Sequence, residues 1–222
     1  MAKKKIDNFD ELNILETNKE FWALTDKAID ALATRTFARF KRFRNKCKGA
    51  DLLEAAFVLK EAEFLYEHLL TDAEEIFADL GKKQYLKIFP KGKNKPNDSW
   101  VRKNIIEEYN TVTKYRFDNE SERKQGYLFE AALASPDDID TTVRKALNLW
   151  TRQLTQYAEE TGRKAAIQAY EDAGVTLVKW VSEKDEKVCS DCNDLDGTVF
   201  EITQIPDTPH HNCRCHLIPV KG

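Results

Sequence analysis

Cysteine and histidine are concentrated near the carboxyl end of this sequence. Four of the five cysteines and three of the four histidines lie between Val188 and Leu217. Cys189 and Cys192 have the Cys-x2-Cys spacing, which places two thiolates at neighbouring corners of a zinc tetrahedron. A hydrophobic core would spread such residues along the chain, so the clustering predicts a closed Cys/His zinc site.

The remaining ligands must come from the segment between His210 and Cys215. His210 and Cys213 repeat the x2 spacing. Cys213 and Cys215 alternate as residues do on a strand, so both can face a metal while Arg214 points away. The expected ligands, in order of rank, are Cys189, Cys192, His210, Cys213 and Cys215, followed by His211 and His216. Which of Cys213 and Cys215 completes the site stays open.

A metal is expected here because the last part of the chain is small. About 45 residues with few large apolar side chains are near the limit below which a domain needs a metal or disulfides. A structural zinc supplies roughly 10–16 kcal/mol of apparent binding free energy. The basic N-terminus, with Lys3, Lys4 and Lys5, lacks the apolar stretch of a signal peptide. We therefore expect reduced thiols and zinc; disulfides and free structural thiols are the alternatives.

The sequence that precedes this cluster is predicted to be mainly helical. Residues 1–18 are polar and unpatterned and are expected to form a flexible arm, whereas 19–134 form a helical region. Within it, apolar residues three or four apart predict helices over about 19–46, 51–80, 100–115 and 127–133. Residues 82–99 contain Pro, Gly and many lysines and are expected to form a basic linker.

A second long helix is expected over 135–173, begun by the Ser-Pro-Asp-Asp sequence at 135–138 and ended by Gly174. Residues 175–181 alternate as a strand does, and a Cys/His subdomain occupies 175–222. The predicted fold class is mainly α: an elongated helical region followed by a small zinc-stapled α+β C-terminal domain.

Residues 135–222 resemble a known family. Gly174, the strand with Trp180, the Cys189-x2-Cys192 pair, Leu195-Asp196-Gly197 and Cys213-Arg214-Cys215 are similar to the C-terminal signature of phage head morphogenesis proteins, the Mu F-like or SPP1-type minor head proteins. The family usually has His-Pro before its last cysteines. Here His211 stands where proline is usual, which leaves His210 as the matching histidine.

The resemblance implies a low-copy structural protein of a tailed-phage head, without established catalytic residues. Such proteins join the capsid during assembly in the host cytoplasm and bind the portal or the major capsid protein. A contact with packaged double-stranded DNA is a further expectation, and no small-molecule substrate is expected. The alternatives are a zinc-ribbon adaptor for nucleic acid or protein, and a His-Asn-His-type nuclease suggested by residues 210–212. That nuclease fold needs a further downstream histidine on a helix.

Charge and hydropathy restrict the possible partners. No apolar run approaches the ~18 residues that a membrane span needs. The formal net charge is −3, so a nucleic-acid contact must come from a local patch. Residues 34–48 carry seven Lys/Arg and no acid, with Phe37, Phe40 and Phe43 on one helix face. This pattern is typical of core packing with a solvated basic face, and a phosphate-contacting surface is the alternative. The aspartates at 191, 194 and 196 are expected to shape turns.

Overall fold

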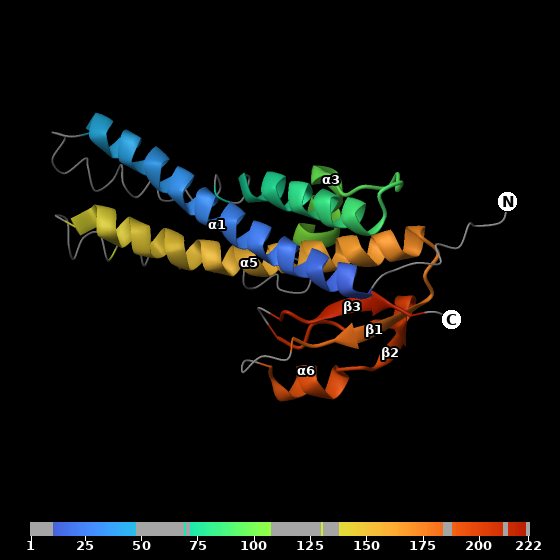
Figure 1. Cartoon of the computed structure of the whole chain (residues 1–222). Coiled ribbons are helices and arrows are strands. Elements are labelled where there is room, and N and C mark those ends of the chain that lie inside the picture. The colour runs from blue at the N-terminus through green and yellow to red at the C-terminus, as the bar shows by residue number, and fades with distance from the viewer. Residues whose placement is uncertain are drawn as a thin grey trace. The chain divides into compact units, whose positions relative to one another are not determined.

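The computed structural model describes residues 11–47, 69, 72–107, 130, 138–183, 188–210 and 213–220 (Figure 1). It is mainly helical, with a small antiparallel sheet near the carboxyl end. In chain order, the elements are α1 (Glu11–Cys47), a helix that includes residues 72–88, α3 (Asp98–Val101) continued by a π-helical turn (Arg102–Glu107), α5 (Ile139–Asp172), β1 (Leu177–Val181), α6 (Ser190–Leu195), β2 (Val199–Glu201), a 3₁₀ turn (Ile202–Gln204) and β3 (His216–Pro219).

The long helix α1 follows from its sequence pattern. Residues 11–47 contain neither proline nor glycine, the two residues that most disfavour a helix interior. Its buried positions recur every three or four residues, as one helix face requires: Phe21, Thr25, Ile29, Leu32, Thr36 and Phe40. The helix expected over 19–46 is therefore confirmed. Phe40 is fully buried, as expected for core packing, and the side chain of Phe43 lies outside the described residues.

The predicted helix over 135–173 is confirmed as α5, which the structure describes from Ile139. Its C-terminal half carries the small residues Ala158, Gly162, Ala165 and Ala169, all buried, which let neighbouring elements approach closely. The helix ends at a turn in which the N–H of Gly174 donates to the carbonyl of Glu171 at 2.9 Å. Gly174 has φ +81°, a conformation that glycine adopts at little cost, so the predicted terminator acts as one.

Two expected boundaries are wrong. Residues 11–18 belong to α1 and are not a loose arm. Residues 82–88 continue the helix past Gly81, so the linker is confined to the segment between Ile88 and Asp98. Gly81 is buried in that helix, and a Cβ there would lie 3.0 Å from Cγ2 of Thr161 on α5. The glycine thus permits close packing of two helices and does not end one.

Other predicted helices fall partly outside the described residues. Of 51–80, the structure describes Leu69 and residues 72–80, which are helical. Of 100–115, the structure describes residues 100–107, which belong to α3 and to a π-helical turn that the sequence did not indicate. Of 127–133, only Glu130 is described, and it is helical. Within the described parts of the chain, we find no helix that combines the length and apolarity of a membrane span.

The chain forms two compact units, neither of which is a single stretch of sequence. The first contains Met1–Thr25, Phe77–Ser99 and Gln156–Gly222, and the second contains Asp26–Ile76 and Trp100–Thr155. In the second unit, α1 and α5 are joined by an ion pair between Nη1 of Arg44 and Oδ1 of Asp140 at 2.5 Å. The Arg144 guanidinium lies 4.4 Å from the ring centroid of Phe37. Each of these two arginines therefore contacts a side chain on the other helix.

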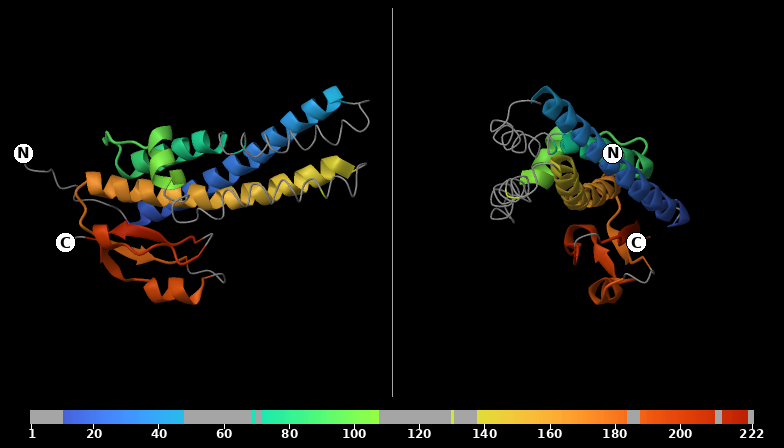
Figure 2. Two further views of the ribbon diagram at one scale, coloured as in Figure 1. Left: turned by 180° about the vertical axis from the view of Figure 1, so that it is seen from behind. Right: turned by 90° about the vertical axis from the view of Figure 1, so that its left-hand side faces the viewer.

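The first unit holds the sheet, whose strand order is β2-β1-β3 with both pairs antiparallel. Trp180 on the central strand is paired with Leu217 on β3. In the views of Figures 1 and 2, the sheet lies between the C-terminal half of α5 and α6. The Tyr170 hydroxyl on α5 donates to the Leu217 carbonyl at 2.9 Å. The core of this unit comprises Tyr85, Ile88, Ala165, Ala166, Ala169, Tyr170, Val178, Trp180, Cys192, Cys213 and Leu217.

Candidate metal centre

The short helix α6 positions the first pair of cysteines. Cys189 is its N-cap residue, with an extended backbone (φ −80°, ψ 164°). Its Sγ accepts a hydrogen bond from the backbone N–H of Cys192 at 3.3 Å. Serine and aspartate oxygens usually fill this capping role, so the thiol replaces them as the acceptor at the helix start. The x2 spacing is therefore built as one helical turn, with Cys192 only 2% exposed.

The segment before β3 brings in the other candidates. It is tied to α5 by Arg163, whose Nη2 donates to the Pro206 carbonyl at 2.6 Å. Strand β3 begins only at His216, so residues 213–215 are not a strand. The predicted alternation is nevertheless present in their exposure, because Cys213 is buried, Arg214 is exposed and Cys215 is half-buried.

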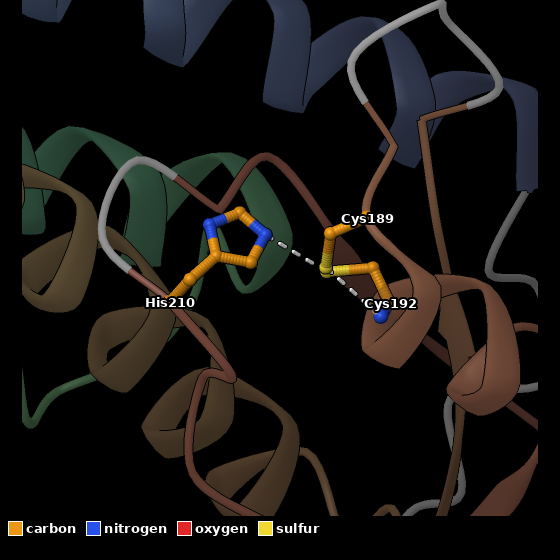
Figure 3. A group of neighbouring side chains, drawn as sticks. All are labelled: Cys189, Cys192 and His210. Carbon is orange, nitrogen blue, oxygen red and sulfur yellow. Dashed lines mark hydrogen bonds between the residues drawn. The ribbon is translucent and has the colours of Figure 1, made fainter.

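The other four predicted ligands lie around Cys192. Its Sγ lies 3.2 Å from Nε2 of His210 and 3.6 Å from Sγ of Cys213. Figure 3 shows the His210 ring beside the sulfur atoms of Cys189 and Cys192. Among the described residues, two groups have ligand atoms mutually within 4.8 Å: one of Cys189, Cys192 and His210, the other of Cys192, Cys213 and Cys215. Cys192 is the member that both groups share.

These spacings suit a tetrahedral ion. Zn–S bonds of about 2.3 Å place two sulfur ligands about 3.8 Å apart around a tetrahedral zinc. The 3.6 Å between the sulfurs of Cys192 and Cys213 is close to that value. Thiolate and imidazole donors also match the soft to borderline preference of zinc. Either group could therefore hold a metal ion.

The thiols affect one another electrostatically. Burial, followed by hydrogen bonding to Cys189 and Cys215, raises the pKa of Cys192 to about 12. The hydrogen bond with Cys215 and burial raise the pKa of Cys213. The same hydrogen bond, accepted from Cys213, lowers the pKa of Cys215 to about 6. Among these three thiols, the mutual hydrogen bonds therefore favour the thiolate form at Cys215 and the protonated form at Cys192 and Cys213.

The lower-ranked histidines do not join these groups. His211 lies outside the described residues. His216 is buried on β3, paired with Val181, and belongs to neither group. Its Nδ1 and Nε2 atoms have no hydrogen-bond partner among the described residues. Burial lowers the pKa of its imidazole, which favours the neutral form.

Of the three nearby aspartates, Asp196 holds the backbone. Oδ1 of Asp196 accepts the N–H of Ser182 at 2.9 Å, which joins the end of β1 to the turn after α6. Asp191 and Asp194 are exposed on α6. The turn-forming role expected for Asp196 is thus confirmed.

Sequence reasoning did not single out Arg163. Its guanidinium lies 4.6 Å from the ring centroid of Trp180 and lines a small cavity together with His210, Cys213 and Cys215. Burial lowers its pKa, and the charges of Glu160, Cys213, Asp207 and Cys215 oppose that shift. Arg163 is one of several basic residues on α5, and no spacing in the sequence links it to cysteines at least 26 residues away.

Comparison with known proteins identifies a family model that matches the C-terminal part of the chain. Residues 130–218 match the family model described as Phage Mu protein F like protein. This stretch covers less than half of the chain and includes every candidate ligand, so the resemblance noted for the C-terminal part is confirmed. The search of curated proteins and the search of solved structures found no match.

Proposed function

We propose that this protein is a structural minor head protein of a tailed phage, which binds the portal or the major capsid protein during head assembly. The match of residues 130–218 to the Mu F-like family supports a role in head morphogenesis. We further propose that the protein resides in the virion head, assembled in the host cytoplasm, and that its role is not enzymatic.

The metal in this proposal is a structural zinc. Cys189, Cys192, Cys213 and either His210 or Cys215 would hold it. The observation that carries the proposal is the position of Cys192, within 3.2 Å of His210 and 3.6 Å of Cys213. Ligands at Cys192 and in the 210–215 segment would join α6 to the segment that leads into β3. When bound, the ion supplies a cross-link between parts of a small domain.

The surplus of ligands favours this structural role over a catalytic one. A catalytic zinc keeps one position open for water, whereas five candidate side chains here compete for four positions. A His-Asn-His-type nuclease would also need a downstream histidine on a helix. His216 lies on strand β3 and is buried, which argues against that alternative.

A contact with packaged DNA is part of the proposal for α1. Between Ala31 and Cys47 this helix has no acidic residue. Arg35, Arg39, Lys41 and Arg42 are exposed on it. Exposed cations on one helix can approach the phosphates of a duplex and release counterions, so the contact would need no base recognition.

Purified phage heads provide the test. We expect cross-linking mass spectrometry on intact heads to join this chain to the portal or major capsid protein, and metal analysis of the purified full chain to find about one zinc per chain. Cryo-electron microscopy of the same heads would place the chain. Heads that lack the chain throughout assembly would contradict the proposed role, and a folded, reduced chain without affinity for zinc would contradict the metal site.

A further inference from the structure

We propose that Arg163 is the counter-charge of the metal centre, a role that rests on the zinc site proposed above. Arg163 lies on α5, outside the segments that carry the ligands. Its positive charge would offset the negative charge of the Cys213 and Cys215 thiolates.

The metal centre would carry a net negative charge. Three or four thiolates carry more negative charge than a divalent zinc ion neutralises. The site is partly buried, with Cys192 and Cys213 only 2% and 5% exposed. A net charge in such a place is costly unless an opposite charge lies nearby. Arg163 lines the same cavity as Cys213 and Cys215 and interacts electrostatically with both.

The Arg163 side chain is held in place by two contacts. The Arg163 guanidinium is fixed on two sides: it lies 4.6 Å from the centroid of the Trp180 ring, and Nη2 donates to the Pro206 carbonyl at 2.6 Å. A planar guanidinium can stack on an aromatic ring and donate hydrogen bonds along its edge at the same time. Both partners belong to the metal-binding region, because Trp180 lies on the central strand and Pro206 precedes His210. The cation is therefore held beside the ligands before a metal arrives.

Two substitutions separate charge from hydrogen bonding. Arg163→Lys keeps the positive charge, whereas Arg163→Gln keeps an N–H donor for the Pro206 carbonyl and removes the charge. Lys164→Gln is a matched control, since it removes a cation from the next position of α5, where Lys164 pairs with Glu160 at 3.8 Å. Circular dichroism of each full-length variant checks that the helices are retained.

The measurement is zinc affinity by competition with a chelator. Mutation of a residue that interacts with the metal ligands, without binding the metal itself, typically lowers metal affinity about 10–100-fold. We expect a loss of about that size for Arg163→Gln, a loss below about tenfold for Arg163→Lys, and little change for Lys164→Gln. If Arg163→Gln binds zinc like the unchanged chain, or if Arg163→Lys is as weak as Arg163→Gln, the charge role is wrong. An unchanged chain that binds no zinc contradicts the metal site itself.

Discussion

Nε2 of His210 lies 3.2 Å from Sγ of Cys192, although the two residues are 18 positions apart, with β2 and a 3₁₀ turn between them. The contact joins the start of α6 to the segment that precedes β3. Because Cys192 also lies 3.6 Å from Cys213, one buried sulfur is common to both candidate ligand groups. The five ligands are therefore not equivalent.

Replacement of single ligands should reveal this hierarchy. Cys192→Ser disrupts both groups and is expected to abolish zinc binding. His210→Ala or Cys215→Ser leaves the other group intact, so each should still bind about one zinc per chain with lower affinity. Metal analysis after gel filtration measures the stoichiometry. Equal loss in all three variants would contradict the central position of Cys192.

Zinc affinity should rise with pH. The raised pKa values of Cys192 and Cys213 mean that both thiols are protonated near neutral pH in the metal-free chain. Zinc must displace these protons, so each displaced proton makes the apparent affinity rise about tenfold per pH unit. The protons of Cys192 and Cys213 alone predict a rise of about 100-fold per unit between pH 6 and 8. Calorimetry in buffers of different ionisation enthalpy counts the protons, and an affinity independent of pH would count against this assignment.

The basic part of α1 should affect DNA binding through Arg39 and Arg42. Both are exposed, whereas Arg44 is paired with Asp140 and is left unchanged. Arg39→Glu/Arg42→Glu should weaken duplex binding and reduce the dependence of log affinity on log salt by up to about 2. Lys91→Glu/Lys93→Glu, at exposed positions after the helix that ends at residue 88, changes the net charge equally and should have a smaller effect. An unchanged salt slope in the arginine variant would exclude the contact.

Gly162 on α5 should not tolerate a methyl group. A Cβ there would lie 2.3 Å from Cζ of Phe21, a buried residue of α1. Overpacking costs about 1–3 kcal/mol, and the higher helix propensity of alanine offsets about 1 kcal/mol of it. Gly162→Ala should therefore destabilise the chain by up to about 2 kcal/mol in urea unfolding. Shortening the neighbour in Gly162→Ala/Phe21→Leu should recover part of the loss; no recovery would mean that another contact is responsible.

The sequence alone predicts those structural features that depend on residues close together in the chain. The periodicity of Phe21, Leu32 and Phe40 predicts α1, and Gly174 predicts the end of α5, because both signals act within a few residues. The clustering of cysteine and histidine similarly pointed to the side chains that, among the described residues, form the two groups around Cys192. None of these predictions depends on contacts between residues far apart in the sequence.

What the sequence did not predict depends on contacts between distant residues. Gly81 lies within a helix, where its lack of a side chain leaves room for Thr161 on α5, 80 positions away in the sequence. Arg163 lies beside the cysteines only because α5 packs on the sheet. The capping of α6 by the Cys189 sulfur is local, but a thiol is an uncommon acceptor at a helix start, so the Cys-x2-Cys pattern did not reveal it.

The division of the chain into units has a consequence for its synthesis on the ribosome. The core of the first unit needs Tyr85, Ala165 and Leu217, which are made early, late and almost last in this sequence. This core therefore cannot close until Leu217 has been made. A pause in translation between residues 99 and 156 would lengthen the time for which Tyr85 lacks Ala165 as a core partner.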